Sequence, residues 1–161
     1  MLVWLGLIIL FAAIPFLYVV FFGAPYVPTF ERDLKTIFKT VELSKKSLVI
    51  DLGSGDGRLL VIAAKKGYRV IGYEINPILW LISLIRLRKY ADAKVRLASM
   101  WRADVSGADL VFTFLATKYM PRLEKKLQIE MKKDSYFASY VFKLPNIEIV
   151  HKTENTHFYK F

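Results

Sequence analysis

The hydrophobic pattern divides the chain into an apolar N-terminal run and a longer region of short apolar segments between polar turns. Residues 2–22 form one unbroken apolar run, and the first charged side chain is Glu31. Beyond residue 34, apolar positions recur at helical spacing or in short continuous runs, as in buried strands. The pattern therefore predicts a membrane-type segment followed by one α/β domain.

The predicted strands and helices alternate along the second region. We predict strands over residues 47–50, 68–74, 95–98, 110–114 and 136–142, and a closing hairpin over 147–152 and 156–161. We predict helices over residues 34–41, 58–66, 77–90 and 119–132. Such alternation is typical of a parallel sheet with right-handed crossovers and helices on both faces.

The N-terminal run has the length of a membrane span. As a helix, its 21 residues would measure about 31 Å, close to the hydrocarbon thickness of a bilayer. Trp4 and Tyr18 suit interfacial positions, and a transmembrane helix tolerates Pro15. A cleaved signal peptide would need basic residues before the run, and none is present. A buried core helix is the other alternative, and we expect an anchor over residues 1–22.

The charge distribution indicates the orientation of that anchor. The chain has 24 Lys and Arg against 14 Asp and Glu, a net charge of +10. Several of the cations directly follow the apolar run: Arg32, Lys35, Lys39, Lys45 and Lys46. The positive-inside rule then predicts a single-pass protein with its domain on the cytoplasmic, or matrix-equivalent, side. Basic pairs suit a solvated surface or an anionic leaflet, whereas a tethered domain disfavours nucleic acid as a partner.

The composition excludes several kinds of chemistry. The chain has no cysteine, which excludes disulfides, thiolate metal sites and cysteine nucleophiles. His151 and His157 are the two histidines, and both lie near the C-terminus. A histidine-based zinc site or a Ser-His-Asp triad is therefore not expected, and we predict no metal.

A glycine-rich turn after the first strand is the most informative segment. Residues 49–57 read Val-Ile-Asp-Leu-Gly-Ser-Gly-Asp-Gly, so a strand runs into a turn that opens a helix. Such a turn lets a nucleotide-like ligand approach the backbone closely. The spacing departs from the dinucleotide fingerprint G-x-G-x-x-G, because Arg58 stands where its last small residue belongs.

Two acids near this turn point to the ligand. Asp51 precedes the first glycine, where it would repel a pyrophosphate but attract an ammonium group. Glu74 ends the second strand, 21 residues after Gly53, where an acid accepts hydrogen bonds from both ribose hydroxyls. S-adenosylmethionine (SAM) carries both groups and no phosphate. The alternative is a tight turn with incidental acids.

The sequence resembles class I SAM-dependent methyltransferases, and within them a small family of protein-lysine methyltransferases. That family includes archaeal enzymes and membrane-anchored mitochondrial enzymes that modify the ATP synthase c-subunit and the adenine nucleotide translocase. The resemblance rests on five segments: Pro25–Thr29, Asp51–Arg58, Gly72–Pro77, Phe114–Thr117 and Leu123–Leu127. It implies a Rossmann-like, seven-stranded sheet preceded here by one transmembrane helix.

The resemblance also implies roles for single residues. Tyr26 and Thr29 would fold over the methionine end of SAM, and Phe114, Leu115 and Thr117 would form the floor where the lysine enters. The other implied SAM contacts are Asp51, Gly53, Ser54, Gly55, Glu74, Ser99, Met100 and Trp101. Tyr26, Thr117 and Tyr119 are candidates to orient the amine, with Phe114 supplying desolvation. Ser99 is a departure, since many class I enzymes have an acid there that binds the adenine amino group.

The helix predicted over residues 78–87 has two apolar stripes. Ile78, Leu81, Ile82 and Ile85 form the stripe that we expect to cover the sheet. Trp80, Leu84 and Leu87 form the other, which a neighbouring element would bury unless Trp80 contacts the membrane surface or the anchor.

These observations predict three parts and one function. The parts are an anchor (1–22), a linker and pre-motif helix that closes over the cofactor (23–46), and a methyltransferase domain (47–161). We expect SAM-dependent N-methylation of a lysine on a membrane or membrane-proximal protein. The alternatives are methylation of a lipid or small molecule at the membrane, or a SAM-binding assembly factor without turnover.

Overall fold

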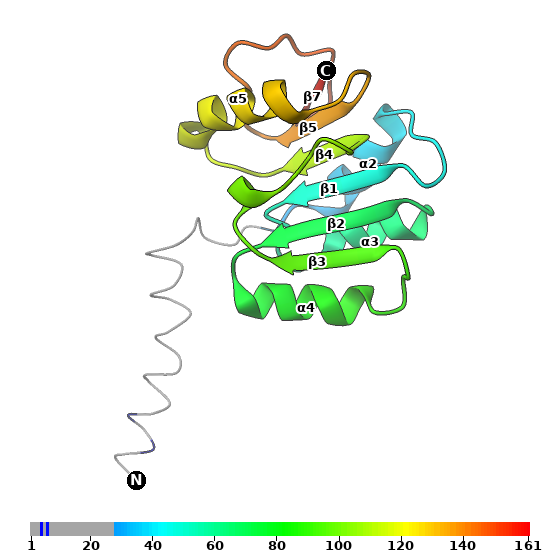
Figure 1. Cartoon of the computed structure of the whole chain (residues 1–161), viewed down its shortest axis with the longest axis vertical. Coiled ribbons are helices and arrows are strands. Elements are labelled where there is room, and N and C mark those ends of the chain that lie inside the picture. Colours follow the sequence, from blue (N-terminus) through cyan, green and yellow to red (C-terminus); the bar gives the residue numbers. More distant parts are fainter. Residues whose placement is uncertain (1–3, 5, 7–27) are drawn as a thin grey trace.

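The computed structural model describes Trp4, Gly6 and residues 28–161. The predicted anchor, apart from those two positions, and Tyr26 lie outside the described residues. The described chain forms a seven-stranded sheet in the order β3-β2-β1-β4-β5-β7-β6 (Figure 1). Neighbouring strands from β3 to β5 are parallel, whereas β7 runs antiparallel to both β5 and β6. The prediction of a seven-stranded Rossmann-like sheet is confirmed.

The strands and helices alternate as the sequence pattern predicts. The strands are β1 (Leu48–Leu52), β2 (Arg69–Glu74), β3 (Ala93–Leu97), β4 (Leu110–Thr113), β5 (Tyr136–Tyr140), β6 (His151–Lys152) and β7 (Thr156–Lys160). The α-helices are α2 (Glu31–Thr40), α3 (Arg58–Lys65), α4 (Pro77–Leu87) and α5 (Met120–Glu130), with 3₁₀ turns η1 (Met100–Arg102) and η2 (Thr117–Tyr119). The closing hairpin is shorter than predicted, because β6 has two residues.

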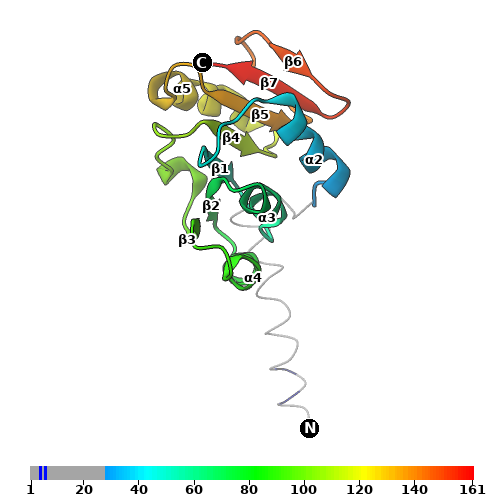
Figure 2. The ribbon, with the colours of Figure 1, turned by 90° about the vertical axis from the view of Figure 1, so that its right-hand side faces the viewer.

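Each face of the sheet has its own hydrophobic core. On one face, α2 and α3 pack against alternate strand residues, and Leu87 of α4 joins the same core (Figure 2). On the other face, α5 packs through Met120, Leu123 and Leu127. Both faces of the central strands are therefore buried, as a parallel sheet requires. None of the described helices has the length and hydropathy of a membrane span.

Helix α4 presents the opposite face to the one predicted. Ile78, Leu81 and Ile85 are exposed, while Ser83 and Leu87 are buried. Trp80 also faces the sheet, since its indole nitrogen donates a hydrogen bond to the Val95 carbonyl at 3.2 Å. The prediction that the Ile78 stripe covers the sheet is therefore wrong.

The glycine turn explains this rotation of α4. The Ser83 hydroxyl donates a hydrogen bond of 2.8 Å to the Gly55 carbonyl. A Cβ atom at Gly57 would lie 2.7 Å from the same hydroxyl, so α4 and the turn approach more closely there than a larger side chain allows. The close, hydrogen-bonded contact between Ser83 and the glycine turn, rather than apolar periodicity, thus sets which side of α4 is buried.

Candidate functional site

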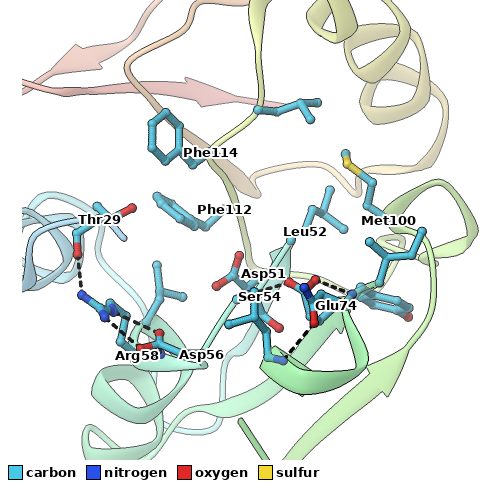
Figure 3. A pocket seen from close by; sticks show the side chains of 18 of the residues that line it. Thr29, Asp51, Leu52, Ser54, Asp56, Arg58, Glu74, Met100, Phe112 and Phe114 are labelled. Carbon is cyan, nitrogen blue, oxygen red and sulfur yellow. Dashed lines mark hydrogen bonds and ion pairs between the residues drawn. The ribbon is translucent and has the colours of Figure 1, made fainter. Parts of the chain in front are cut away.

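The main cavity lies at the carboxyl ends of the central strands. It has a volume of about 490 Å³, and its walls come from the turn after β1, the end of β2 and the segments after β3 and β4 (Figure 3). Strand β1 pairs with β2 on one side and β4 on the other, so the chain order reverses at this point. Ligands of open α/β sheets bind in the crevice beside this switch. The volume lies within the range of small-molecule sites.

The glycine turn forms one wall of the cavity. Gly53, Gly55 and Gly57 all have positive φ, a region that other residues adopt at a cost. The turn is held to β2 because the amides of Gly53 and Ser54 both donate to the Tyr73 carbonyl, at 2.9 and 3.0 Å. A Cβ atom on Gly53 would meet no atom within 4 Å. The missing side chain therefore leaves open space beside the backbone where a ligand can lie.

Asp51 is a buried acid facing the cavity. Its side chain is almost inaccessible, and among the described residues its Oδ1 atom has no hydrogen-bond partner. Burial raises the pKa of this carboxyl well above its usual range, and the negative charges of Glu74 and Asp56 raise it further. A ligand with an ammonium group would supply both the missing donor and the missing counter-charge.

Glu74 holds the turn in addition to facing the cavity. One carboxylate oxygen accepts from the Gly55 amide and the other from the Asn76 amide, each at 2.7 Å. The sequence predicts Glu74 as a ligand for ribose but does not reveal these backbone contacts. Since each carboxylate oxygen accepts more than one hydrogen bond, the acid can serve both purposes.

A third acid fixes the outer end of the turn. Asp56 accepts hydrogen bonds from Arg58 at 2.8 Å and from Arg86 at 2.5 Å. Burial favours a higher pKa for Asp56, but these two guanidinium groups outweigh it and lower the pKa to about 2. Arg58 also donates to the Thr29 carbonyl at 3.3 Å, so the segment before α2 is tied to the turn (Figure 3). Thr29 is buried and lines the cavity, as predicted.

The side of the cavity after β3 is formed by Ser99, Met100 and Trp101. The Ser99 hydroxyl caps η1 by accepting from the Trp101 amide at 3.4 Å. The indole of Trp101 is half-buried, with the Arg122 guanidinium 4.1 Å from its ring centre and the Tyr119 ring 6.4 Å away. Trp101 thus belongs to the cavity wall as well as to the packing beneath it.

Aromatic rings form the wall after β4. Phe114 packs edge-on against Tyr140, with ring centres 5.0 Å apart, and stacks on Phe142 at 6.2 Å. The Tyr140 hydroxyl donates to Asp33 of α2 at 2.7 Å, and the Asn155 amide donates to the same carboxylate oxygen at 3.0 Å. The hydrogen bond from Tyr140 is the main reason that the pKa of Asp33 is lowered. A buried network thus fixes the ring against which Phe114 packs.

A strained turn directs Phe142 into this wall. Val141 has φ of 67°, which is rare for a β-branched residue. The Phe142 amide donates to the Tyr140 carbonyl at 2.9 Å, closing a three-residue turn. Strain of about 1–3 kcal/mol is common at functional sites. Here the strained residue, Val141, is the one at which the chain reverses beside the cavity.

Most predicted site residues in the described part of the chain line the cavity. They are Thr29, Asp51, Gly53, Ser54, Gly55, Glu74, Ser99, Met100, Trp101, Phe114, Leu115 and Tyr119. Thr117 does not line it; this residue begins η2 and is exposed, and its neighbour Ala116 forms the wall instead. Ser54 lines the cavity, but its hydroxyl points towards β2. A Cβ atom built on Gly72 of that strand would lie 2.6 Å from the Ser54 hydroxyl oxygen. Its hydroxyl oxygen has no hydrogen-bond partner among the described residues.

Several lining residues are absent from the sequence predictions. They include Asn76, Leu79, Phe112 and Phe142. Asn76 and Leu79 lie two and five residues after Glu74, at the start of α4, so their nearness to that motif could have identified them. Phe112 precedes Phe114 by two residues, so strand periodicity could have identified it. Phe142 carries no such signal, because the turn at Val141 places it there. Among the described residues, no group of three or more potential metal ligands is present.

Replacing Ser99 with aspartate tests the adenine side of the cavity. We expect Ser99→Asp to tighten SAM binding, because a charge-assisted hydrogen bond to the adenine amino group would replace a neutral one. Aspartate also caps helix N-termini, so η1 should be retained. Calorimetric titration of the full chain measures the effect, with Asp104→Asn as an exposed control. Weaker binding by a folded variant would show that another group already holds the amine.

Comparison with known proteins gives three consistent similarities. Residues 51–151 match the family described as the ANTKMT methyltransferase domain. The chain is 35% identical to the ATP synthase c-subunit lysine N-methyltransferase of Xenopus laevis over 127 residues, which cover 76% of this chain and 55% of that protein. It is 31% identical to a protein-lysine N-methyltransferase of Saccharolobus islandicus (strain REY15A) over 125 residues, covering 74% and 78% of the two chains.

A solved structure shares the fold. The RNA methyltransferase from Salinibacter ruber, in complex with S-adenosyl-L-homocysteine, superposes with a TM-score of 0.75. The match covers 84% of this chain and 92% of that chain at 23% identity, and at this identity it supports the fold alone. The chain spans about half the length of the ATP synthase c-subunit lysine N-methyltransferases that it matches.

Proposed function

The chain belongs to the family of the ANTKMT methyltransferase domain, and on this premise we propose that it methylates a lysine side chain. The cofactor is SAM. The observation that carries the proposal is the pair of carboxylates, Asp51 and Glu74, on either side of a glycine turn at the switch point of the sheet.

The cavity fits SAM group by group. The buried Asp51 oxygen, which has no hydrogen-bond partner among the described residues, suits the amino group. Each Glu74 oxygen can accept a further hydrogen bond, which suits the ribose hydroxyls. Met100 and Trp101 offer apolar surfaces for the adenine. When bound, SAM supplies a methyl group on a positively charged sulfonium, so the chain's own residues need only position the acceptor and exclude water.

The aromatic wall provides what a lysine acceptor needs. A lysine must be neutral to attack the methyl carbon, and its ordinary pKa is about 10.4. Phe112, Phe114 and Phe142 form an apolar surface that disfavours the ammonium form and so lowers that pKa. Tyr119 is partly exposed, lines the cavity beside Trp101 and can orient the amine. The proton released by the amine passes to water.

We further propose that the acceptor lies at a membrane. The apolar run over residues 2–22 supports an anchor, and the cations that follow it support a domain on the cytoplasmic or matrix-equivalent side. Tethering raises the effective concentration of membrane-bound acceptors over soluble ones. Two mammalian relatives are named for the ATP synthase c-subunit and the adenine nucleotide translocase, which is consistent with a protein acceptor.

Labelling with radioactive methyl SAM tests this function. Membranes containing the full chain should incorporate label into protein as methyl-lysine, and membranes with the Asp51→Asn variant should incorporate much less at the same subsaturating SAM concentration. Mass spectrometry of membrane and soluble fractions, with and without the chain, should place the lost methyl-lysine in membrane proteins. Label found only in lipid, in RNA or in soluble proteins would refute the proposal. SAM binding without any transfer would favour a non-catalytic assembly factor instead.

A further inference from the structure

Helix α4 has an exposed apolar face that the SAM site does not use. Ile78, Leu81 and Ile85 are 52%, 52% and 56% exposed and follow one another at spacings of three and four residues. They therefore share one stripe of the helix, on the side opposite to the buried Ser83 and Leu87. Since Ser83 is hydrogen-bonded to the glycine turn, α4 cannot rotate to bury this stripe without breaking the site.

Exposed cations lie at the C-terminal end of this stripe. They are Arg88 and Lys89, with Asp92 following them, whereas Arg86 is paired with Asp56. Helices α3 and α4 both follow parallel strands and return across the same face of the sheet. Their C-terminal ends therefore lie at the same end of the sheet, where the parallel strands begin. Exposed Lys65 and Lys66 at the end of α3 therefore join Arg88 and Lys89 there. An exposed apolar stripe with a basic margin is typical of helices that lie in a membrane interface.

We propose that α4 docks flat on an anionic lipid surface, with Ile78, Leu81 and Ile85 inserted among the headgroups. The positive charge of the margin matches phosphate-bearing lipids. The position of the helix also favours it. Figures 1 and 2 show α4 at one extreme of the body, beyond the edge strand β3 and away from β6 and β7.

The distance from the apolar N-terminal run is compatible with such docking. Only residues 23–27 separate that run from Pro28, which lines the cavity. Five residues span at most about 18 Å. If the run is in a bilayer, the cavity therefore stays near the headgroups, and α4 is within reach of them. Asn76 and Leu79 at the start of α4 line the cavity too, so docking would hold one wall of the cavity near the lipid surface.

This docking goes beyond the proposed function, because it does not depend on the nature of the methyl acceptor. A fluorescent label attached at α4 can test it, since the chain has no cysteine of its own. The full-length Leu81→Cys variant would be labelled and reconstituted in vesicles of phosphatidylcholine and phosphatidylglycerol that contain a lipid-borne quencher. The Ile129→Cys variant is the matched control, because Ile129 is 83% exposed and lies on α5.

We expect the label at position 81 to be quenched at least about threefold more strongly than the label at 129, as shallow insertion requires. Charge reversal at the margin, Arg88→Glu with Lys89→Glu, should reduce that quenching towards the control level. The matched reversal, Lys125→Glu with Lys133→Glu, should not. S-adenosylhomocysteine binding by every variant confirms that each is folded.

Three results would overturn the proposal. A label at 81 that stays exposed to water would show that α4 does not dock. A label that is shielded but not quenched by lipid would show that the N-terminal run or a second copy of the chain covers the stripe. Equal quenching at 81 and 129 would show adsorption without orientation. None of these readings measures methyl transfer, so they are independent of the proposed function.

Discussion

Asp51→Asn should weaken SAM binding by about tenfold or more while leaving the protein at least as stable as the wild type. The variant keeps the shape of the side chain but loses the charge that faces the ligand's ammonium group, and charge-assisted hydrogen bonds contribute about 1.5–3 kcal/mol. In the absence of ligand, the acid is buried with an oxygen that has no partner among the described residues. Its negative charge therefore destabilises the folded state. Removing that charge should therefore increase the free energy of unfolding.

The Glu74→Gln variant should differ from Asp51→Asn in its effect on stability. Both oxygens of Glu74 accept backbone amide protons, and glutamine offers only one acceptor oxygen. This variant should lose affinity and stability together. Calorimetric titration and urea unfolding of the detergent-solubilised chain measure the two effects, with Asp104→Asn as the exposed control. An Asp51→Asn variant that binds SAM as tightly as the wild type would contradict the assignment of the site.

Gly57→Ala should lower the free energy of unfolding by about 2–5 kcal/mol and also weaken SAM binding. Gly57 has φ of 79°, which costs a residue with a Cβ atom about 1–2 kcal/mol. The new methyl group would also lie 2.7 Å from the Ser83 hydroxyl oxygen and 3.3 Å from the Ser83 Cα atom. To relieve this overlap, α4 must move and its hydrogen bond to Gly55 must stretch, at a further cost of about 1–3 kcal/mol.

The Gly67→Ala variant separates the cost of the backbone conformation from the cost of the contact with Ser83. Gly67 has φ of 84°, but a Cβ atom there would meet nothing within 4 Å. This control should show the backbone cost of about 1–2 kcal/mol alone and should leave SAM binding unchanged. Urea unfolding curves and calorimetric titrations provide both comparisons. Equal losses of stability in the two variants would mean that the close approach of α4 to the turn contributes nothing.

The sequence predicts the order of strands and helices well because the signals are local. Short apolar segments locate β1, β2, β4 and β5, whereas β3 alternates apolar residues with Lys94 and Arg96. The Asn76-Pro77 pair locates the start of α4, where the Asn76 side chain accepts from the amides of Ile78 and Leu79. The buried face of α4 is not predicted, since both of its stripes are apolar and periodicity cannot rank them. The choice depends on Ser83 meeting a glycine turn that lies 28 residues earlier.

The two sides of the cavity also differ in how far apart their residues lie in the sequence. On its SAM side, two short motifs supply Asp51 and Glu74, and a third short segment, residues 99–101, follows β3. Its aromatic side depends on contacts that no short motif contains. Tyr140 reaches Asp33 across 107 residues, and the unusual backbone at Val141 sends Phe142 back over Phe114.

The contacts of Asp33 also constrain when the cavity can form during synthesis. Its carboxylate binds Tyr140 and then Asn155, which is 122 residues further along a chain of 161. Contacts of such long sequence separation form late, because the intervening chain must be ordered first. While β5 and β7 are still inside the ribosome, Tyr140 and Asn155 cannot bind this acid and the aromatic wall is open. The acceptor side of the cavity is thus completed only after the SAM side, when α2 and the segment before β7 meet.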